Sequence, residues 1–225
     1  MRGKGKRTLL SGGVLLVVAV LVGVGTLASF TAQTRNPSNV LANGTLVMSN
    51  KVGTGTACLS TSGGTTDSNV NNACDVAINR TVQKPGDSYT ADLTIKNEGS
   101  LAASALKLFM AACANGDAAG ESYHGTGLPC GKVQLYVQEM DSGFAANVSC
   151  KYGGGTATDC DFSDAAKTLG AYQTAYNSSA SGLGLGATAA GASKYYRIGV
   201  KLPSDADNTY QGRSATFDLT WYMEQ

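Results

Sequence analysis

The stretch KPGDSYTADLTIKNEGSLAAS, residues 84–104, places a strand pattern between two turn signals. Pro85 presets the backbone angle of a turn, and Gly86 is free to adopt positive φ. Leu93 and Ile95 then alternate with polar neighbours, which is typical of a strand with one buried face. The segment NEGS follows as a second turn signal before the next apolar run. We therefore expect a half-buried antiparallel strand here.

Short apolar runs bounded by turn residues recur along the rest of the chain. Several of them also alternate with period two, as at Val133, Leu135 and Val137. Such alternation indicates one buried and one solvated face, which is typical of antiparallel sheets in a sandwich or barrel. The sequence predicts an all-β, antiparallel β-sandwich with long loops and strands at residues 44–49, 74–82, 88–97, 105–113, 132–140, 194–202 and 214–223.

Two other segments have different compositions. The stretch DFSDAAKTLGAY, residues 161–172, predicts a short helix that Asp161 or Ser163 would cap. Residues 177–193, NSSASGLGLGATAAGAS, are low in complexity and are expected to form a long loop within the domain.

The N-terminus has the order of a secretory signal, a basic start followed by an apolar run from Leu9 to Leu27. Small residues precede Ala28, so we expect cleavage after Ala28, with Ser29 or Phe30 as the new start. The apolar run is long enough to span a bilayer, and an uncleaved anchor remains the alternative. We expect a signal peptide at residues 1–28, an arm at residues 29–41 and one β-sandwich domain at residues 42–225.

The charge of the part after residue 28 argues against two classes of partner. This part holds all 16 acidic residues and all but four of the 17 basic residues, so it is mildly acidic. It therefore lacks the excess of positive charge that is typical of proteins that bind nucleic acid or an anionic membrane surface.

Six cysteines in an exported chain are most simply three disulfides. The sequence leaves the connectivity open, and we expect pairing between neighbours, each pair closing a loop rich in small and polar residues. Zinc is the alternative, but the sequence has no C-x-x-C pair and one histidine. The expected pairs are Cys58 with Cys74, Cys113 with Cys130, and Cys150 with Cys160.

No recognisable catalytic constellation is present, and we expect neither enzymatic activity nor a cofactor. The one histidine, His124, is expected to be a solvated loop residue. The segment GTGLPCGK resembles the end of a P-loop, but Thr126 replaces the required first glycine. Asp205, Asp207 and Asn208 offer oxygen ligands for calcium without EF-hand spacing, so a plain acidic turn is the expected reading.

Four segments together resemble the TasA and camelysin (CalY) family of exported bacterial matrix proteins. They are GTLASF at residues 25–30, NVLANGTLVMSN at residues 39–50, the block at residues 84–104, and DNTYQGRSATFDLTWYMEQ at residues 207–225. The resemblance implies a jelly-roll-like sandwich, processing by a SipW-type signal peptidase, and extracellular fibres in a biofilm matrix. Six cysteines are not expected from the family pattern.

The resemblance also implies an assembly mode in which the N-terminal arm of one subunit adds as a strand to the next. Adding an extended segment to an open sheet edge satisfies main-chain donors and acceptors, and a head-to-tail contact propagates into a filament. In this chain the arm would be residues 29–41, and its apolar side chains would be Phe30, Ala32, Val40 and Leu41. A disordered N-terminal tail is the plain alternative.

Three functions follow as hypotheses. The first is a secreted structural protein whose partner is another copy or a related matrix protein. The second is a monomeric secreted or cell-surface binding module that uses loops such as residues 179–193. The third is a camelysin-like metalloprotease, which the supply of one histidine argues against because catalytic zinc normally needs three protein ligands.

Overall fold

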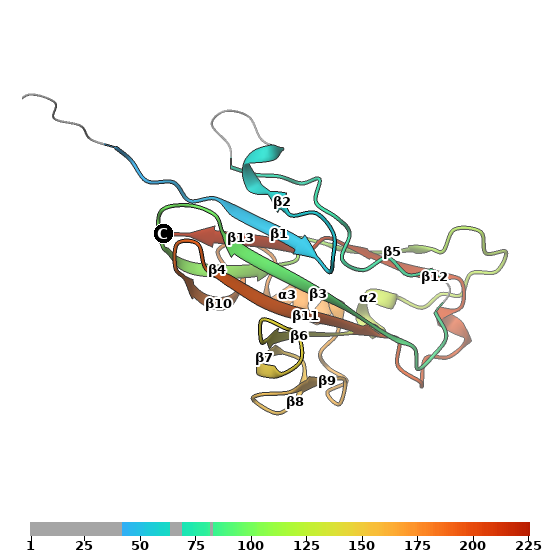
Figure 1. The fold of residues 1–225 in the computed structure, drawn as a ribbon. Helices are drawn as coiled ribbons and strands as arrows, with labels where there is room; N and C mark the ends of the chain where they lie inside the picture. The colour runs from blue at the N-terminus through green and yellow to red at the C-terminus, as the bar shows by residue number, and fades with distance from the viewer. Residues whose placement is uncertain (1–41, 64–68, 82) are drawn as a thin grey trace, which may run out of the picture. The chain divides into compact units, whose positions relative to one another are not determined.

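Two layers of antiparallel strands enclose the core in the computed structural model, which describes residues 42–63, 69–81 and 83–225 (Figure 1). Asn43–Gln225 forms one compact unit. The larger sheet has the order β2-β1-β3-β11-β6-β7, with β1 (Met48–Val52), β2 (Cys58–Leu59), β3 (Ser88–Asn97), β6 (Gln134–Met140), β7 (Asn147–Tyr152) and β11 (Ser193–Lys201). The predicted all-β antiparallel sandwich is confirmed.

The second layer is built from a long two-stranded ribbon with one added strand. The added strand β10 pairs with β4, which pairs with β13, while β5 pairs with β12 further along. The register slips by a single residue between Phe217↔Cys113 and Thr220↔Phe109, so β4–β5 and β12–β13 run as one bulged ribbon. The bounds are β4 (Ala103–Phe109), β5 (Cys113–Asp117), β10 (Leu183–Thr188), β12 (Arg213–Phe217) and β13 (Thr220–Glu224).

Small elements complete the described fold. The helices are α2 (Pro129–Lys132) and α3 (Leu169–Ala175), with 3-10 turns η1 (Ser60–Ser62) and η2 (Asn208–Tyr210). The pair β8 (Gly154–Gly155) and β9 (Cys160–Asp161) lies beside β6 and β7.

Residues 84–104 contain β3, which has the predicted bounds, residues 88–97. Its alternate side chains are buried, including Leu93 and Ile95. The last buried one is Asn97, whose Nδ2 donates to the Leu101 carbonyl at 2.8 Å and whose Oδ1 accepts from Gly99 N at 3.0 Å. The Asn97 side chain thus hydrogen-bonds main-chain groups of the turn that follows β3. A buried residue therefore stabilises the NEGS turn.

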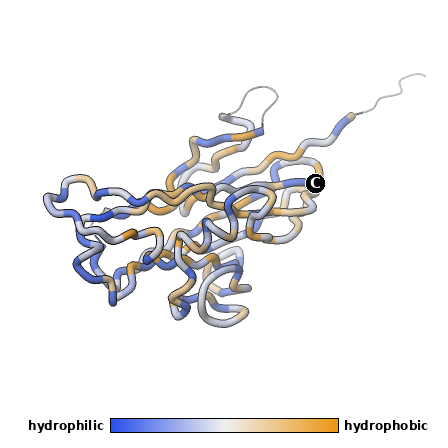
Figure 2. The backbone as a smooth tube through the Cα atoms, turned by 180° about the vertical axis from the view of Figure 1, so that it is seen from behind, coloured by the Kyte–Doolittle hydropathy of each residue, from blue (hydrophilic) through white to orange (hydrophobic). Residues whose placement is uncertain are grey.

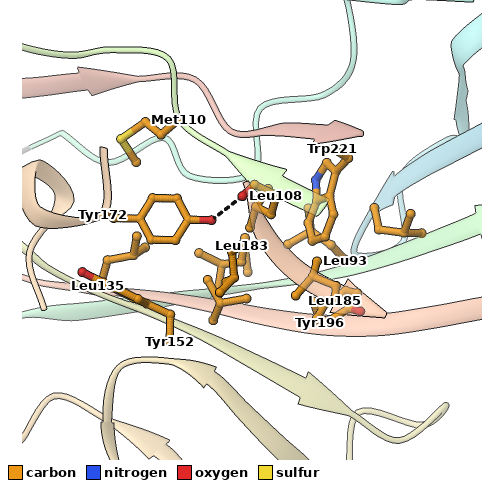
Figure 3. Packing of buried hydrophobic residues seen from close by; sticks show 14 of the residues in the cluster. Leu93, Leu108, Met110, Leu135, Tyr152, Tyr172, Leu183, Leu185, Tyr196 and Trp221 are labelled. Atoms are coloured by element: carbon orange, nitrogen blue, oxygen red, sulfur yellow. Dashed lines mark hydrogen bonds between the residues drawn. The ribbon is translucent and has the colours of Figure 1, made fainter. Parts of the chain in front are cut away.

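The core lies between the two layers (Figure 3). Leu93, Leu135 and Tyr196 come from the larger sheet, and Leu108 and Leu185 come from the second layer. The Tyr172 hydroxyl of α3 reaches across and donates to the Leu108 carbonyl at 2.9 Å, as the dashed line in Figure 3 marks. Helix α3 is therefore tied to the second layer by a buried hydrogen bond as well as by packing.

Strand β6 is buried on both faces, contrary to the expected alternation. Leu135 and Val137 face the core, while Gln134, Tyr136 and Gln138 on the other face are also buried. The chain around β7, β8 and β9 covers this second face. Consecutive residues of a strand are buried when both faces of the strand are covered, as in the interior of layered folds.

Several sequence expectations about secondary structure were wrong. The strand expected at residues 44–49 lies at Met48–Val52 instead. Residues 74–81 form no strand, although their pattern predicted one. The stretch expected as a long loop contains β10, which pairs with β4 because that strand offers it an open edge. The helix begins at Leu169 rather than near Asp161, because the Thr168 hydroxyl is the cap that accepts from Ala171 N at 3.2 Å.

Candidate functional site

A groove of about 560 Å³ opens at the end of the sandwich where β5 and β12 lie, away from the C-terminus. Several loops at this end are hydrophilic, and they appear blue in Figure 2. The floor of the groove is apolar and includes Val133, Leu169 and Val200. Its volume falls within the roughly 300–1,000 Å³ typical of ligand pockets. The groove is the candidate functional site of the described chain.

One wall of the groove is β12, which has a neighbour on one side only among the described strands. Ala118 N donates to the Gly212 carbonyl at 2.9 Å, which makes 118 and 212 a hydrogen-bonded pair. Antiparallel pairing alternates, so the main-chain groups of Arg213, Ala215 and Phe217 point away from β5. Those three residues also line the groove. The groove therefore lies against β12, and Ala215 and Phe217 reach it on the face that packs on the core. Just before β12 the same outer edge is paired, because Gly125 N donates to the Gln211 carbonyl at 2.9 Å and Gly127 N donates to the Thr209 carbonyl at 2.7 Å.

Helix α2 lies against both strands of this pair, β5 and β12. Helices α2 and α3 pack beside β5, and Cys130 N donates to the Asn115 side chain at 2.8 Å. The disulfide between Cys113 and Cys130 ties α2 to the same strand. Among the described strands, β12 has β5 as its one neighbour and β5 has β12.

The opposite wall contains residues 75–81, which we call the strap, followed by the Lys84–Pro85 turn. Among described residues, no hydrogen bond joins the strap's main chain to any partner. Ala77 and Ile78 pack against the core, and the Arg80 guanidinium lies 3.7 Å from the centroid of the Tyr89 ring. Side chains, rather than main-chain pairing, hold the strap in place.

The disulfides join the neighbouring cysteines, as the sequence predicted. Cys58–Cys74 anchors the start of the strap to β2, and Cys150–Cys160 closes the loop beside β6. All six cysteines are paired. Three disulfides indicate an extracellular or otherwise oxidising environment.

A buried amide organises the loop that the Cys150–Cys160 disulfide closes. Gln138 is 1% exposed, and its Oε1 accepts from Cys160 N at 2.6 Å. Its Nε2 donates to the carbonyls of Ser149 at 2.9 Å and Thr158 at 3.1 Å. Gln138 was not predicted from the sequence, because it lies within an ordinary strand pattern and its partners lie 11, 20 and 22 residues further along the chain.

The predicted solvated histidine lies beside the groove region rather than inside it. His124 is exposed, and its Nδ1 lies 2.7 Å from the Gly212 carbonyl oxygen and 3.9 Å from Asp117 Oδ1. Asp117 also pairs with Arg213 across β5 and β12. Gly212 has φ of +64°, and a side chain there would collide with the Tyr123 carbonyl. The close approach of the Tyr123 main chain to residue 212 therefore requires glycine.

The candidate calcium ligands have separate partners. Asp205 pairs with Lys132 at 3.0 Å, and Asp207 caps η2 by accepting from Thr209 N at 2.9 Å. The Thr209 hydroxyl and main-chain amide hold the pKa of Asp207 below its usual range. Asn208 begins η2 and lines the groove. In the part of the chain that the structure describes, no group of three or more His, Cys, Asp or Glu side chains could hold a metal ion.

Three buried tyrosines have pKa values well above the usual range. Burial raises the pKa of Tyr152 to about 12 and raises those of Tyr172 and Tyr196 further. Tyr152 and Tyr172 pack edge to face with ring centroids 4.9 Å apart, and Tyr196 packs against Trp221. These rings are part of the core rather than of the groove.

The remaining predicted site residues lie outside the described residues. They are the cleavage pair Ala28 and Ser29 and the apolar arm residues Phe30, Ala32, Val40 and Leu41. Among the described residues, no helix has the length and apolar character needed to cross a membrane.

Comparison with known proteins identifies no family. No protein-family model matches the chain, and no curated protein matches it. One solved structure that shares some similarity is a family 123 glycoside hydrolase from Clostridium perfringens, studied for glycolipid glycan hydrolysis, at 12% sequence identity and a TM-score of 0.27. The match covers 62% of this chain and 20% of that one, so the chain spans about a fifth of the hydrolase. A likeness this distant carries no argument about function.

Proposed function

We propose that this chain is a secreted structural protein that forms, or associates with, extracellular biofilm-matrix fibres. Its subunits are linked head to tail when the N-terminal arm, residues 29–41, adds as a strand to a neighbouring subunit. The observation that carries the proposal is the unpaired edge of β12 beside an apolar-floored groove. An exposed edge offers a row of main-chain donors and acceptors to an added strand.

The three disulfides support an extracellular location in this proposal. A SipW-type signal peptidase acts during export, after which the partner is another copy or a related matrix protein. The protein needs no cofactor, performs no catalysis and binds no nucleic acid in this role. The membrane is involved only through the signal segment before cleavage.

Electron microscopy of two exported forms tests the proposal. One form begins at Ser29 and the other begins at Ala42, so that they differ only by the arm. We expect fibres from the first and monomers from the second, over a range of concentrations and in mild acid. Monomers from both forms would contradict a self-assembling fibre subunit.

A monomeric binding module is the second candidate, and the groove itself favours it. Arg80, Lys84 and Glu121 give the groove polar groups around an apolar floor, which is the usual composition of a ligand site. The loop first considered for this role contains β10 and belongs to the second layer, so the groove replaces it as the candidate surface. Binding of a surface glycan by the form that begins at Ala42, without fibres from either form, would favour this candidate.

A further inference from the structure

The tripeptide Ala-Asn-Gly occurs twice in the sequence, at residues 42–44 and at residues 114–116. An asparagine before glycine can lose its side-chain amide, because glycine has no Cβ to keep its nitrogen away from the asparagine side chain. The reaction needs an asparagine side chain that can turn towards the next main-chain amide, and an amide that is not already hydrogen-bonded. The two tripeptides have the same local sequence but lie in different surroundings, so the fold decides which of them can react.

The first tripeptide lies just before the anchored part of the chain. Asn43 and Gly44 are both exposed and belong to no strand, and Figure 1 shows them in the blue stretch that leads into β1. Hydrogen bonding to the sandwich begins at Thr45, whose N–H donates to Ser100 Oγ at 3.0 Å and whose carbonyl accepts from Leu101 N at 3.0 Å. Among the described residues, neither the Gly44 amide nor the Asn43 side chain has a hydrogen-bond partner.

Packing favours glycine at position 44. A Cβ atom there would collide with the side chain of Leu101, which lies in the turn between β3 and β4. A larger residue would force Leu101 to move away from the chain that leads into β1. The fold therefore favours the Asn–Gly sequence at this position.

The second tripeptide is held within β5. The hydrogen-bonded pair at 118 and 212 makes 116 and 214 the next such pair, because antiparallel pairing alternates. The Gly116 amide is therefore engaged with Ser214 of β12. The Asn115 Oδ1 accepts from Cys130 N at 2.8 Å, which holds the side chain towards α2. Both groups that would have to react are thus restrained by hydrogen bonds.

We propose that Asn43 is a site of spontaneous deamidation in the folded protein and that the fold protects Asn115 from the same reaction. The Gly44 nitrogen loses its proton to solvent and attacks Cγ of Asn43. The bond from Cγ to the side-chain nitrogen breaks, that nitrogen takes up a proton, and ammonia leaves. Water then opens the resulting succinimide at either of its carbonyls, which gives aspartate or isoaspartate.

The product differs from asparagine in charge and, for isoaspartate, in the path of the main chain. A negative charge is added, and isoaspartate places the former side-chain methylene in the main chain. Asn43 is the first residue of the compact unit, and the hydrogen bonds of Thr45 lie after it. We therefore expect the sandwich to keep its thermal midpoint after the reaction. This inference does not depend on the proposed function.

The two tripeptides allow a test within one protein. The exported full chain is incubated at physiological temperature and pH, and its tryptic peptides are followed by mass spectrometry, with isoaspartate detected by enzymatic methylation. We expect Asn43 to convert at least about tenfold faster than Asn115, because reaction at a protected site requires local opening. The reduced chain unfolded in urea is the control, in which the two asparagines should convert at similar rates.

Two variants assign the signal. Asn43→Gln should abolish the fast reaction, because the longer side chain does not form the same ring, whereas Asn115→Gln should leave it unchanged. Equal rates for Asn43 and Asn115 in the folded chain would overturn the proposal. A rate at Asn43 at least about tenfold below its rate in the unfolded chain would also overturn it, because that result would show protection at this site. A thermal midpoint that falls as Asn43 converts would contradict its position outside the anchored structure.

Discussion

The Oε1 atom of Gln138 accepts a hydrogen bond from the main-chain amide of Cys160 at 2.6 Å, inside the face of β6 that the Cys150–Cys160 loop covers. The same side chain donates to the carbonyls of Ser149 and Thr158. One amide of β6 therefore satisfies main-chain groups of β7, of β9 and of the loop between β8 and β9. The loop closed by this disulfide is held to the sandwich by a polar contact as well as by packing.

Replacing Gln138 by alanine should be strongly destabilising. It leaves the Cys160 amide and at least one carbonyl buried without a partner, at about 1–3 kcal/mol for each group, and it adds a cavity. We expect a loss of roughly 3 kcal/mol in the free energy of unfolding, measured by urea denaturation with the disulfides intact. Gln173→Ala is the control, because its bond to the Ala111 carbonyl at 3.4 Å is long and exposed, and it should cost less than about 1 kcal/mol. Equal losses for the two variants would show that the Gln138 contacts contribute little.

Two fully buried tyrosines form a matched pair. The Tyr172 hydroxyl donates to the Leu108 carbonyl, whereas the Tyr196 hydroxyl finds no partner among the described residues. We expect Tyr172→Phe to cost about 1–2 kcal/mol, because the bond is lost and a carbonyl remains buried. Tyr196→Phe should be neutral or stabilising, because it removes a buried group that is not hydrogen-bonded. Thermal and urea unfolding of both variants would decide, and a costly Tyr196→Phe would indicate a water bound at that hydroxyl.

Alkaline pH should unfold the protein through its buried phenols. Burial raises the pKa of Tyr152 from 10.0 to about 12 and also raises those of Tyr172 and Tyr196. A raised tyrosine pKa means that the unfolded state releases its proton first. The stabilising contribution is therefore complete below about pH 10 and is lost as the pH rises towards 12. We expect the free energy of unfolding to fall across this window.

This effect is measured by following the near-ultraviolet absorbance of tyrosinate together with circular dichroism during an alkaline titration. Part of the tyrosine signal should appear only together with the loss of structure. Tyr152→Phe should reduce the fall in stability between pH 10 and 12, whereas Tyr222→Phe, on the exposed face of β13, serves as the control. Smooth ionisation of every tyrosine with structure retained at pH 12 would contradict the prediction.

Removing the Cys58–Cys74 disulfide should loosen the strap while leaving the sandwich folded. The strap has no main-chain hydrogen bonds among described residues, so the disulfide and the packing of Ile78 are its main attachments. We expect C58S/C74S to be cleaved by trypsin after Arg80 at least about tenfold faster than wild type, because proteolysis follows local opening. The thermal midpoint should change by only a few degrees.

The matched control is C113S/C130S, which removes the disulfide that joins β5 to α2. That bond joins a buried part of the fold, so its loss should lower the thermal midpoint without a selective increase in cleavage at Arg80. Slow cleavage at Arg80 in C58S/C74S would show that side-chain packing alone holds the strap.

The groove was not predictable from the sequence, although segments on two of its walls were both expected to be strands. Residues 74–82 and 214–223 have similar strand patterns, yet residues 74–81 form no strand, whereas the second region contains β12 and β13. The apolar–polar pattern of a segment shows that its side chains suit a sheet. Whether the segment pairs as a strand depends on whether another strand presents an open edge beside it. The candidate site is the place where one such edge has no strand beside it in the described fold.

The sequence by itself determined the features that depend on local chemistry. Turn residues and the alternation of apolar and polar side chains predicted β3 at residues 88–97. The disulfides join cysteines that are neighbours in the sequence, each pair closing a short loop. Tertiary structure alone decided that the Gly-rich stretch forms β10, that β6 is buried on both faces, and that the strap remains unpaired. The reason is physical: a turn or a short loop is defined within a few residues, but the hydrogen-bond partner of a strand and the cover of its face come from distant parts of the chain.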